Sequence, residues 1–154
     1  MIKVKLDSKL VLQQLERLSK GAANPRPALL AIGESLVEST KKRFGSSSAP
    51  DGKPWAANSA LTLKRKRGSK PLVNEGTLRD QIGYVESGNQ LTIFSSMIYA
   101  ATQQFGAKQG AFGRSRRNTP IPWGTIPARP FLGVSNDDEK MIVETVSEYL
   151  RSLV

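Results

Sequence analysis

Three segments in which apolar residues recur every three or four positions constrain the fold more than any other feature of this 154-residue chain. They span residues 8–20, 27–44 and 135–153. Residues three and four apart share one face of a helix, so each segment predicts an amphipathic helix. A chain of this length normally forms one domain around one core, and we predict a single domain over residues 1–154.

The ends of these three helices carry recognisable signals. Gly21 favours the end of the first helix, and Pro25 favours a turn before the second. The second helix finishes with basic residues at positions 41–43 and then a glycine, and positive charge there suits the helix dipole. Ser135 and Asp138 form an S-x-x-D capping pattern before the third helix.

Two regions show the two-residue alternation of a β-strand. Residues 2–6 alternate apolar side chains with lysine, which predicts a short N-terminal strand. Residues 82–95 contain IGYVE and QLTIFS on either side of SGN, which predicts a hairpin. The predicted fold class is therefore α+β: a small antiparallel sheet, made of the N-terminal strand plus the hairpin near 82–95, packs against about three longer helices.

Shorter elements and loops fill the middle of the chain. Ser59 is a suitable cap for a short helix through ALTLKRKR that stops at Gly68, and Thr77 is a suitable cap for a single turn. Residues 98–105 predict another short helix. Trp55 closes a turn-rich loop, and we expect it to anchor that loop in the core.

Cysteine and histidine are both absent, which excludes many kinds of active site. Such a chain has no disulfide, no Cys/His zinc site and no Ser–His or Cys–His nucleophile pair. We predict no catalytic site, no metal and no cofactor. Carboxylates alone can hold Mg²⁺, so a small nuclease or hydrolase stays as a third alternative. Its candidate ligands are scattered without a metal-binding spacing, at Asp51, Glu75, Asp80 and Glu86.

No part of the sequence indicates a membrane protein. No apolar run approaches the ~20 residues that span a bilayer. The N-terminal residues lack the continuous apolar core of a signal peptide. We therefore predict a protein that is cytoplasmic when made and has no membrane partner.

The formal net charge of +10 comes from 23 Lys and Arg against 13 Asp and Glu. This balance favours contact with nucleic acid or with an acidic protein surface. The charge is bunched in KRKRGSK and in a long glycine-rich loop over residues 106–125. A solvated helix face is an equally good interpretation of KRKRGSK. The candidate partner or DNA contacts are Lys64, Arg65, Lys66, Arg67, Lys70, Lys108, Arg114, Arg116, Arg117 and Arg129.

Five stretches along the chain resemble the phage virion morphogenesis family, the Mu-type tail completion or head-tail joining proteins. In order they are PDGKPW (50–55), LTLKRKRG (61–68), PLVNEGTLRDQI (71–82), YAATQQFG (99–106) and IPARPFLG (126–133). Together they cover nearly the whole chain. Two positions depart from the pattern of the family, which more often has Asp-Thr-Gly at 74–76 and His-Gln-Phe-Gly at 103–106.

The resemblance implies a structural role without a catalysed reaction. Family members act at the head-proximal end of the tail or at the neck, so a virion location is expected after assembly and the host cytoplasm before it. The implied mechanism is self-association, with a ring expected, and docking to tail-tube or tail-terminator and head-tail connector proteins. Contact with phage DNA is a further expectation. The missing histidine at 103–106 argues against a catalytic function for that stretch.

A basic nucleic-acid-binding module is the main alternative, because basic loops lie near Phe112 and Trp123 in the sequence. Phe105 and Trp123 are nevertheless expected to pack in the core or on loops rather than stack on a ligand. Within IPARPFLG the two prolines hold the backbone extended. We expect Phe131 and Leu132 to support the fold and Arg129 to face an interface.

Overall fold

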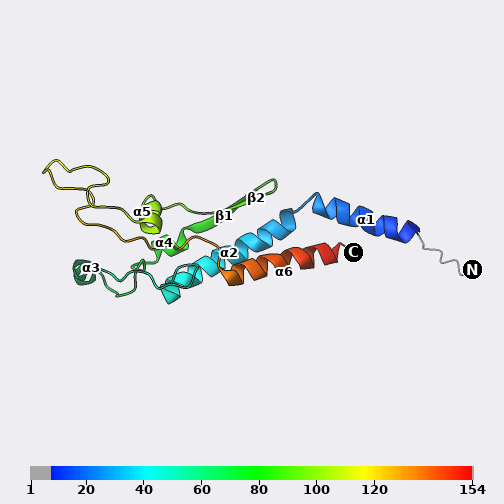
Figure 1. The fold of residues 1–154 in the computed structure, drawn as a ribbon, viewed down its shortest axis with the longest axis horizontal. Helices are drawn as coiled ribbons and strands as arrows, with labels where there is room; N and C mark the ends of the chain where they lie inside the picture. The colour runs from blue at the N-terminus through cyan, green and yellow to red at the C-terminus, as the bar shows by residue number, and fades with distance from the viewer. Residues whose placement is uncertain (1–7, 154) are drawn as a thin grey trace, which may run out of the picture.

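The computed structural model describes residues 8–153, which form an elongated molecule with its loops gathered at one end (Figure 1). Its helices and strands are, in chain order, α1 (Ser8–Ala22), α2 (Arg26–Ser46), α3 (Ala60–Arg65), α4 (Thr77–Asp80), β1 (Ile82–Ser87), β2 (Gln90–Ser95), α5 (Ala100–Phe105) and α6 (Asn136–Ser152). α1, α2 and α6 are the longer helices, and the two strands form an antiparallel hairpin. The predicted α+β class is confirmed.

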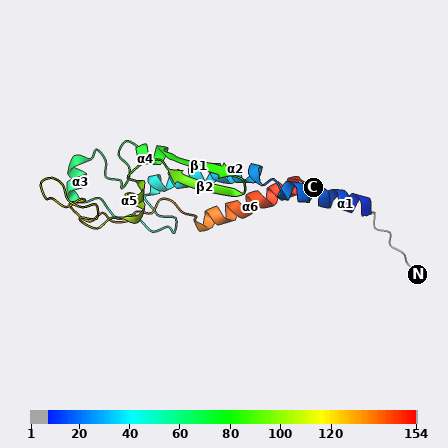
Figure 2. The same cartoon turned by 90° about the horizontal axis from the view of Figure 1, so that it is seen from above.

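α2 is the central element, because the hairpin and α6 both pack against it. α2 and α6 run antiparallel, side by side (Figures 1 and 2). Near the start of α6, Arg43 and Asp138 form a buried ion pair between the two helices. Near its end, the Tyr149 hydroxyl donates to the carbonyl of Asn24, just before α2, at 2.7 Å. α6 is therefore held at both ends.

Arg43 has a different role from the one that its position suggests. The basic residues at 41–43 predict contact with the helix dipole, but Arg43 is buried. Its Nη1 donates to the carbonyls of Phe131 at 2.9 Å and Gly133 at 2.8 Å. A periodic pattern locates the face of a helix that is buried, but it does not identify a polar residue on that face. α2 also continues past the predicted glycine stop and ends with Ser47 in a left-handed conformation.

The hairpin lies along α2. In the part of the chain that the structure describes, its two strands form the sheet. Ile82 pairs with Ser95 at its open end, and the hairpin predicted near residues 82–95 is present. β1 includes Ser87, which pairs with Gln90, so the turn is one residue shorter than the predicted SGN. Gly33 allows β1 to approach α2 closely, because a Cβ there would lie 2.6 Å from Cδ2 of Tyr84. The N-terminal strand predicted over residues 2–6 lies outside the described residues.

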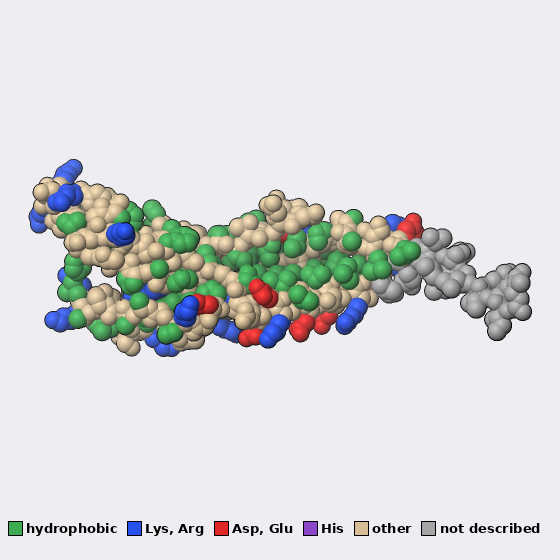
Figure 3. Space-filling view, viewed as in Figure 1, with side chains coloured by type: hydrophobic (Ala, Val, Ile, Leu, Met, Phe, Trp, Pro, Cys, Tyr) green, Lys and Arg blue, Asp and Glu red, His purple; other side chains and the backbone are tan. Residues whose placement is uncertain are grey.

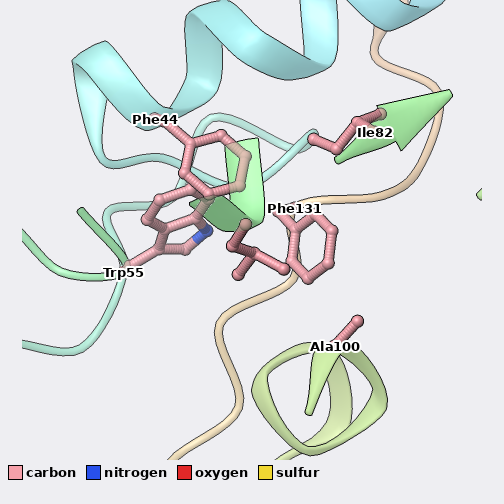
Figure 4. Close-up of a cluster of buried hydrophobic side chains, with 6 residues drawn as sticks. Phe44, Trp55, Ile82, Ala100 and Phe131 are labelled. Carbon is pink, nitrogen blue, oxygen red and sulfur yellow. The ribbon is translucent and has the colours of Figure 1, made fainter. Parts of the chain in front are cut away.

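The core is an aromatic cluster where the C-terminal part of α2 meets the IPARPFLG segment (Figure 4). Phe44 packs edge-on against Trp55, with ring centroids 5.3 Å apart, and lies 5.6 Å from Phe131. Trp55 Nε1 donates to the carbonyl of Pro130 at 2.7 Å. Phe131 has no exposed surface, and Leu132 packs against the cluster. The predicted roles of Trp55, Phe131 and Leu132 in the core are confirmed.

Two predicted serine caps are present. The Ser135 hydroxyl accepts from the Asp138 backbone amide at 3.2 Å, and the Asp138 carboxylate accepts from the Ser135 amide at 2.8 Å, which completes the capping box. Ser59 caps α3. The end predicted for α3 at Gly68 is wrong, because Lys66 already has an extended backbone with φ −102° and ψ 143°.

α4 begins one residue earlier than its predicted cap implies, and α5 begins two residues later than predicted. Thr77 is the first residue of α4, and the cap position belongs to Gly76. Gly76 has φ 87°, a left-handed conformation that side chains with a Cβ rarely adopt. α5 begins at Ala100 instead of residue 98. Neither shift changes the order of the elements.

Candidate partner interface at the basic end

Nine of the ten predicted contact residues lie at one end of the molecule, on residues 59–70 and 106–125 (Figures 1 and 3). These two segments contain nine of the 23 Lys and Arg and no Asp or Glu, so the rest of the chain holds 14 basic and 13 acidic residues. The net charge of +10 is therefore concentrated here. We call this surface the basic end, and its residues are Lys64, Arg65, Lys66, Arg67, Lys70, Lys108, Arg114, Arg116 and Arg117.

The first part of the basic end is α3 and the turn that follows it. The cationic groups at 64, 65 and 67 are exposed, whereas Lys66 is half-buried and donates to the carbonyl of Lys70. Lys70 Nζ donates to the carbonyl of Gly45 at 2.9 Å. This hydrogen bond connects the turn to the end of α2. The exposed cationic side chains therefore lie on a segment whose backbone is held in place.

The second part is the loop over residues 106–125, which forms a hydrogen-bonded arm without regular strands. At its base, Ala107 and Ile126 exchange backbone hydrogen bonds of 2.9 and 2.7 Å. Near its tip, Arg114 Nη1 donates to the carbonyl of Asn118 at 3.0 Å. The basic residues at 116–117 are exposed at the tip. The arm therefore presents its charges from a defined backbone.

A cleft of about 720 Å³ separates α3 from the 106–125 arm. Lys66 and Thr62 of the α3 segment line one side, and Trp123 of the arm lines the other. Tyr99 and Glu75 also line the cleft. Burial, and then the positive charge of Arg129, lower the pKa of Lys66. The basic end thus combines exposed cations with a concave surface that has an aromatic wall.

Arg129 belongs to the interior of the subunit. Only 7% of it is exposed, and it donates to the carbonyls of Ala56 at 2.7 Å and Ala57 at 2.9 Å. No carboxylate forms an ion pair with it within residues 8–153. Its guanidinium fixes the chain that leads into α3. We therefore leave Arg129 out of the proposed contact surface.

Gln104 is a structural residue that the sequence reasoning did not single out. Its side-chain Oε1 accepts from the backbone amides of Phe131 and Leu132, both at 3.0 Å. Its Nε2 donates to the carbonyl of Leu132 at 2.9 Å. Gln104 therefore binds the IPARPFLG backbone as a neighbouring strand would. Gln104 lies in the YAATQQFG stretch, which the family resemblance marks as important. The stretch alone does not show which of its residues binds the IPARPFLG backbone.

Phe105 and Trp123 are expected to pack in the core or on loops, and the structure places neither of them in the core. Phe105 is 78% exposed, Trp123 is 62% exposed, and Phe112 on the arm is 59% exposed. α5 turns Phe105 away from the core, while its Ala100 faces the core. Exposed aromatic side chains beside basic ones add an apolar component to the basic end.

The acidic residues that would serve a metal-dependent enzyme are far apart or paired. Arg79 Nε lies 2.7 Å from a carboxylate oxygen of Asp80, and Arg26 Nε lies 3.0 Å from one of Glu86. In the described residues, no group of three or more Asp or Glu is placed to hold a metal ion. None of the helices between residues 8 and 153 has the length and apolarity to cross a membrane.

These features define a small α+β protein whose net positive charge is gathered at one end. The sequence matches the phage virion morphogenesis family over residues 6–151. It is also 30% identical over 140 residues to the "Mu-like prophage FluMu G protein 2" of Haemophilus influenzae, covering 91% of this chain and 88% of that protein. No solved structure matches the chain. The chain belongs to the phage virion morphogenesis family and is a phage or prophage morphogenesis protein.

Proposed function

We propose that the protein completes the head-proximal end of a phage or prophage tail, or the neck, as a non-enzymatic structural subunit. It associates with itself, in a ring, and docks to tail-tube or tail-terminator proteins and to the head-tail connector. Its final location is the virion. Membership of the morphogenesis family supports this role, and the basic end supplies a surface for an acidic partner.

The observation that carries the docking proposal is the separation of charge along the molecule. The basic end has nine cationic residues and no acidic one, whereas α6 exposes four acidic and two basic residues. A subunit with two unlike surfaces suits heterologous contacts, in which one surface meets a different surface of its neighbour. It also suits a position between two different partners.

The test is mass measurement by light scattering over a concentration series, with and without the tail-tube protein of the same phage. Self-association and a larger mixed particle are expected. A variant with Lys64→Glu, Arg65→Glu and Arg67→Glu should keep the fold, because these residues are exposed, and should lose the mixed particle. The proposal is contradicted if the wild-type protein stays monomeric and does not bind the tail-tube protein.

Contact with phage DNA is a second candidate function for the basic end. It is favoured by the exposed side chains of Phe112 and Trp123 beside the arginines of the 106–125 arm. Phosphate contacts release counterions, so affinity for a DNA duplex should fall steeply with salt. Fluorescence anisotropy at several salt concentrations measures this dependence. No binding near physiological ionic strength argues for the protein partner alone.

A further inference from the structure

α1 contacts the rest of its own chain mainly at its C-terminal end. Gly21 packs so closely on α6 that a Cβ there would lie 1.8 Å from Cδ1 of Leu153. Most of α1 projects beyond this corner, away from α2 and the hairpin, in both views (Figures 1 and 2). Leu15 on this projecting part is 55% exposed. An isolated amphipathic helix of 15 residues is marginally stable in water, so α1 needs a further surface to cover it.

A matching uncovered surface lies on α6. Val143, Val146 and Leu150 recur at three- and four-residue steps and are 65%, 38% and 36% exposed. The hairpin packs against α2, and these exposed fractions leave the row partly uncovered in the described residues. Hydrophobic side chains also form a band along the face made by α2 and α6, which reaches the described end of α1 (Figure 3). An exposed apolar surface of this kind indicates an interaction site.

The two surfaces also match in charge and length. α1 carries three basic residues and one acidic residue. α6 exposes four acidic and two basic residues, because its fifth acidic residue, Asp138, is buried against Arg43. With 1.5 Å of rise per residue, α1 is about 22 Å long and α6 about 25 Å. A helix with net positive charge therefore finds both an apolar row and opposite charge along α6.

We propose that α1 is an exchanged arm, which packs its apolar face along the exposed row of α6 in a second copy of the chain. The projecting part of α1 does not reach the exposed row of its own α6, because α1 contacts α6 near Gly21 and runs away from the body from there. The inference rests on the proposed self-association and specifies its contact. Arm and receptor are different surfaces of one chain, so copies join head to tail and close into a ring when the rotation permits.

Two variants of the full chain test the exchange. Leu15→Glu places a charge on the apolar face of the arm and leaves the receptor, the exposed row of α6, unchanged. Val143→Glu places a charge in the receptor and leaves the arm unchanged. Both side chains are more than half exposed, so the subunit should fold, which circular dichroism checks. In sedimentation velocity, each variant alone should need at least tenfold more protein than wild type to associate. An equimolar mixture should form a 1:1 dimer, because one intact arm meets one intact receptor.

Val85→Glu is the matched control, because Val85 is 52% exposed on the hairpin and should not affect association. The exchange is overturned when both variants associate like wild type, or when their mixture stays monomeric while wild type associates. It is also overturned when Leu15→Glu associates normally but no longer binds the tail-tube protein, which assigns the arm to that partner. A wild-type protein that is monomeric under all conditions contradicts the proposed self-association itself.

Discussion

Arg43 and Asp138 determine how the two long helices meet. Their side chains are 7% and 6% exposed. Arg43 also donates to two backbone carbonyls, and the Asp138 carboxylate also accepts from the amide and hydroxyl of Ser135. A buried ion pair compensates its desolvation only when further hydrogen bonds satisfy both groups, as they do here. The pair therefore fixes the geometry of α2 against α6, and removing one partner is costly.

Arg43→Met should lower the free energy of unfolding by about 3–5 kcal/mol, because it leaves a buried carboxylate without its cation. Urea unfolding measures the change. Lys42→Met is the matched control on the same helix, since Lys42 and its partner Glu38 are both largely exposed. The control should unfold at nearly the wild-type midpoint. Equal midpoints for both variants contradict the structural role of Arg43.

The same pair predicts how stability depends on acid. Burial raises the pKa of Asp138, but serine hydrogen bonds and the charge of Arg43 outweigh it and hold the pKa below its ordinary value of 3.8. A carboxyl with a lowered folded-state pKa contributes stability above its unfolded pKa and loses it as pH falls through the folded one. Wild type should therefore lose stability as pH falls below 3.8, and Asp138→Asn should lose less over that range. Asp137→Asn, at an exposed position, should keep the wild-type slope in acid urea unfolding.

At the scale of elements, the extended IPARPFLG segment links the core to the basic end. Trp55 and Gln104 bind its backbone, and its Phe131 fills the aromatic cluster. Its Arg129 reaches the carbonyls just before α3. Proline prevents this segment from joining a helix, so its polar groups need partners from other elements. The segment thus connects packing in the core to the position of the cationic residues.

Gln104→Leu should lower the free energy of unfolding by about 1–3 kcal/mol, because the amides of Phe131 and Leu132 lose their acceptor. Thermal and urea unfolding measure the loss. Gln103→Leu is the neighbouring control, since the Gln103 backbone carbonyl accepts from Arg129 and survives the change. A larger loss for Gln103→Leu than for Gln104→Leu contradicts the bracing role.

The whole molecule separates two kinds of surface. The basic end offers charge at one extremity (Figures 1 and 3), and the exposed row of α6 and Leu15 of the projecting α1 offer apolar surface towards the other. Contacts at exposed charges weaken as salt shortens the screening length, whereas apolar contacts do not. Self-association and docking should therefore respond differently to ionic strength.

Raising sodium chloride from about 0.1 M to about 1 M should dissociate the tail-tube protein from the assembly, because the screening length falls from about 10 Å to about 3 Å. Self-association should weaken less, because the α1–α6 contact keeps its apolar part. Light scattering at both salt concentrations measures each particle. If high salt abolishes self-association but not binding to the tail-tube protein, the basic end would be the self-association surface and the apolar surfaces would bind the partner. The variant with Lys64→Glu, Arg65→Glu and Arg67→Glu is the control at low salt. It should not bind the tail-tube protein even at about 0.1 M sodium chloride.

The sequence by itself determined the types of the described helices and strands, the caps at Ser59 and Ser135, and the family, because periodicity, capping and motif order are local along the chain. It also located the two basic segments. The tertiary structure alone decided that these segments lie together around a cleft and that Arg43 and Arg129 lie inside. It decided that α1 projects from the body as well. These outcomes depend on contacts between residues that are distant in sequence, and a local pattern does not encode which polar side chain meets a distant carbonyl.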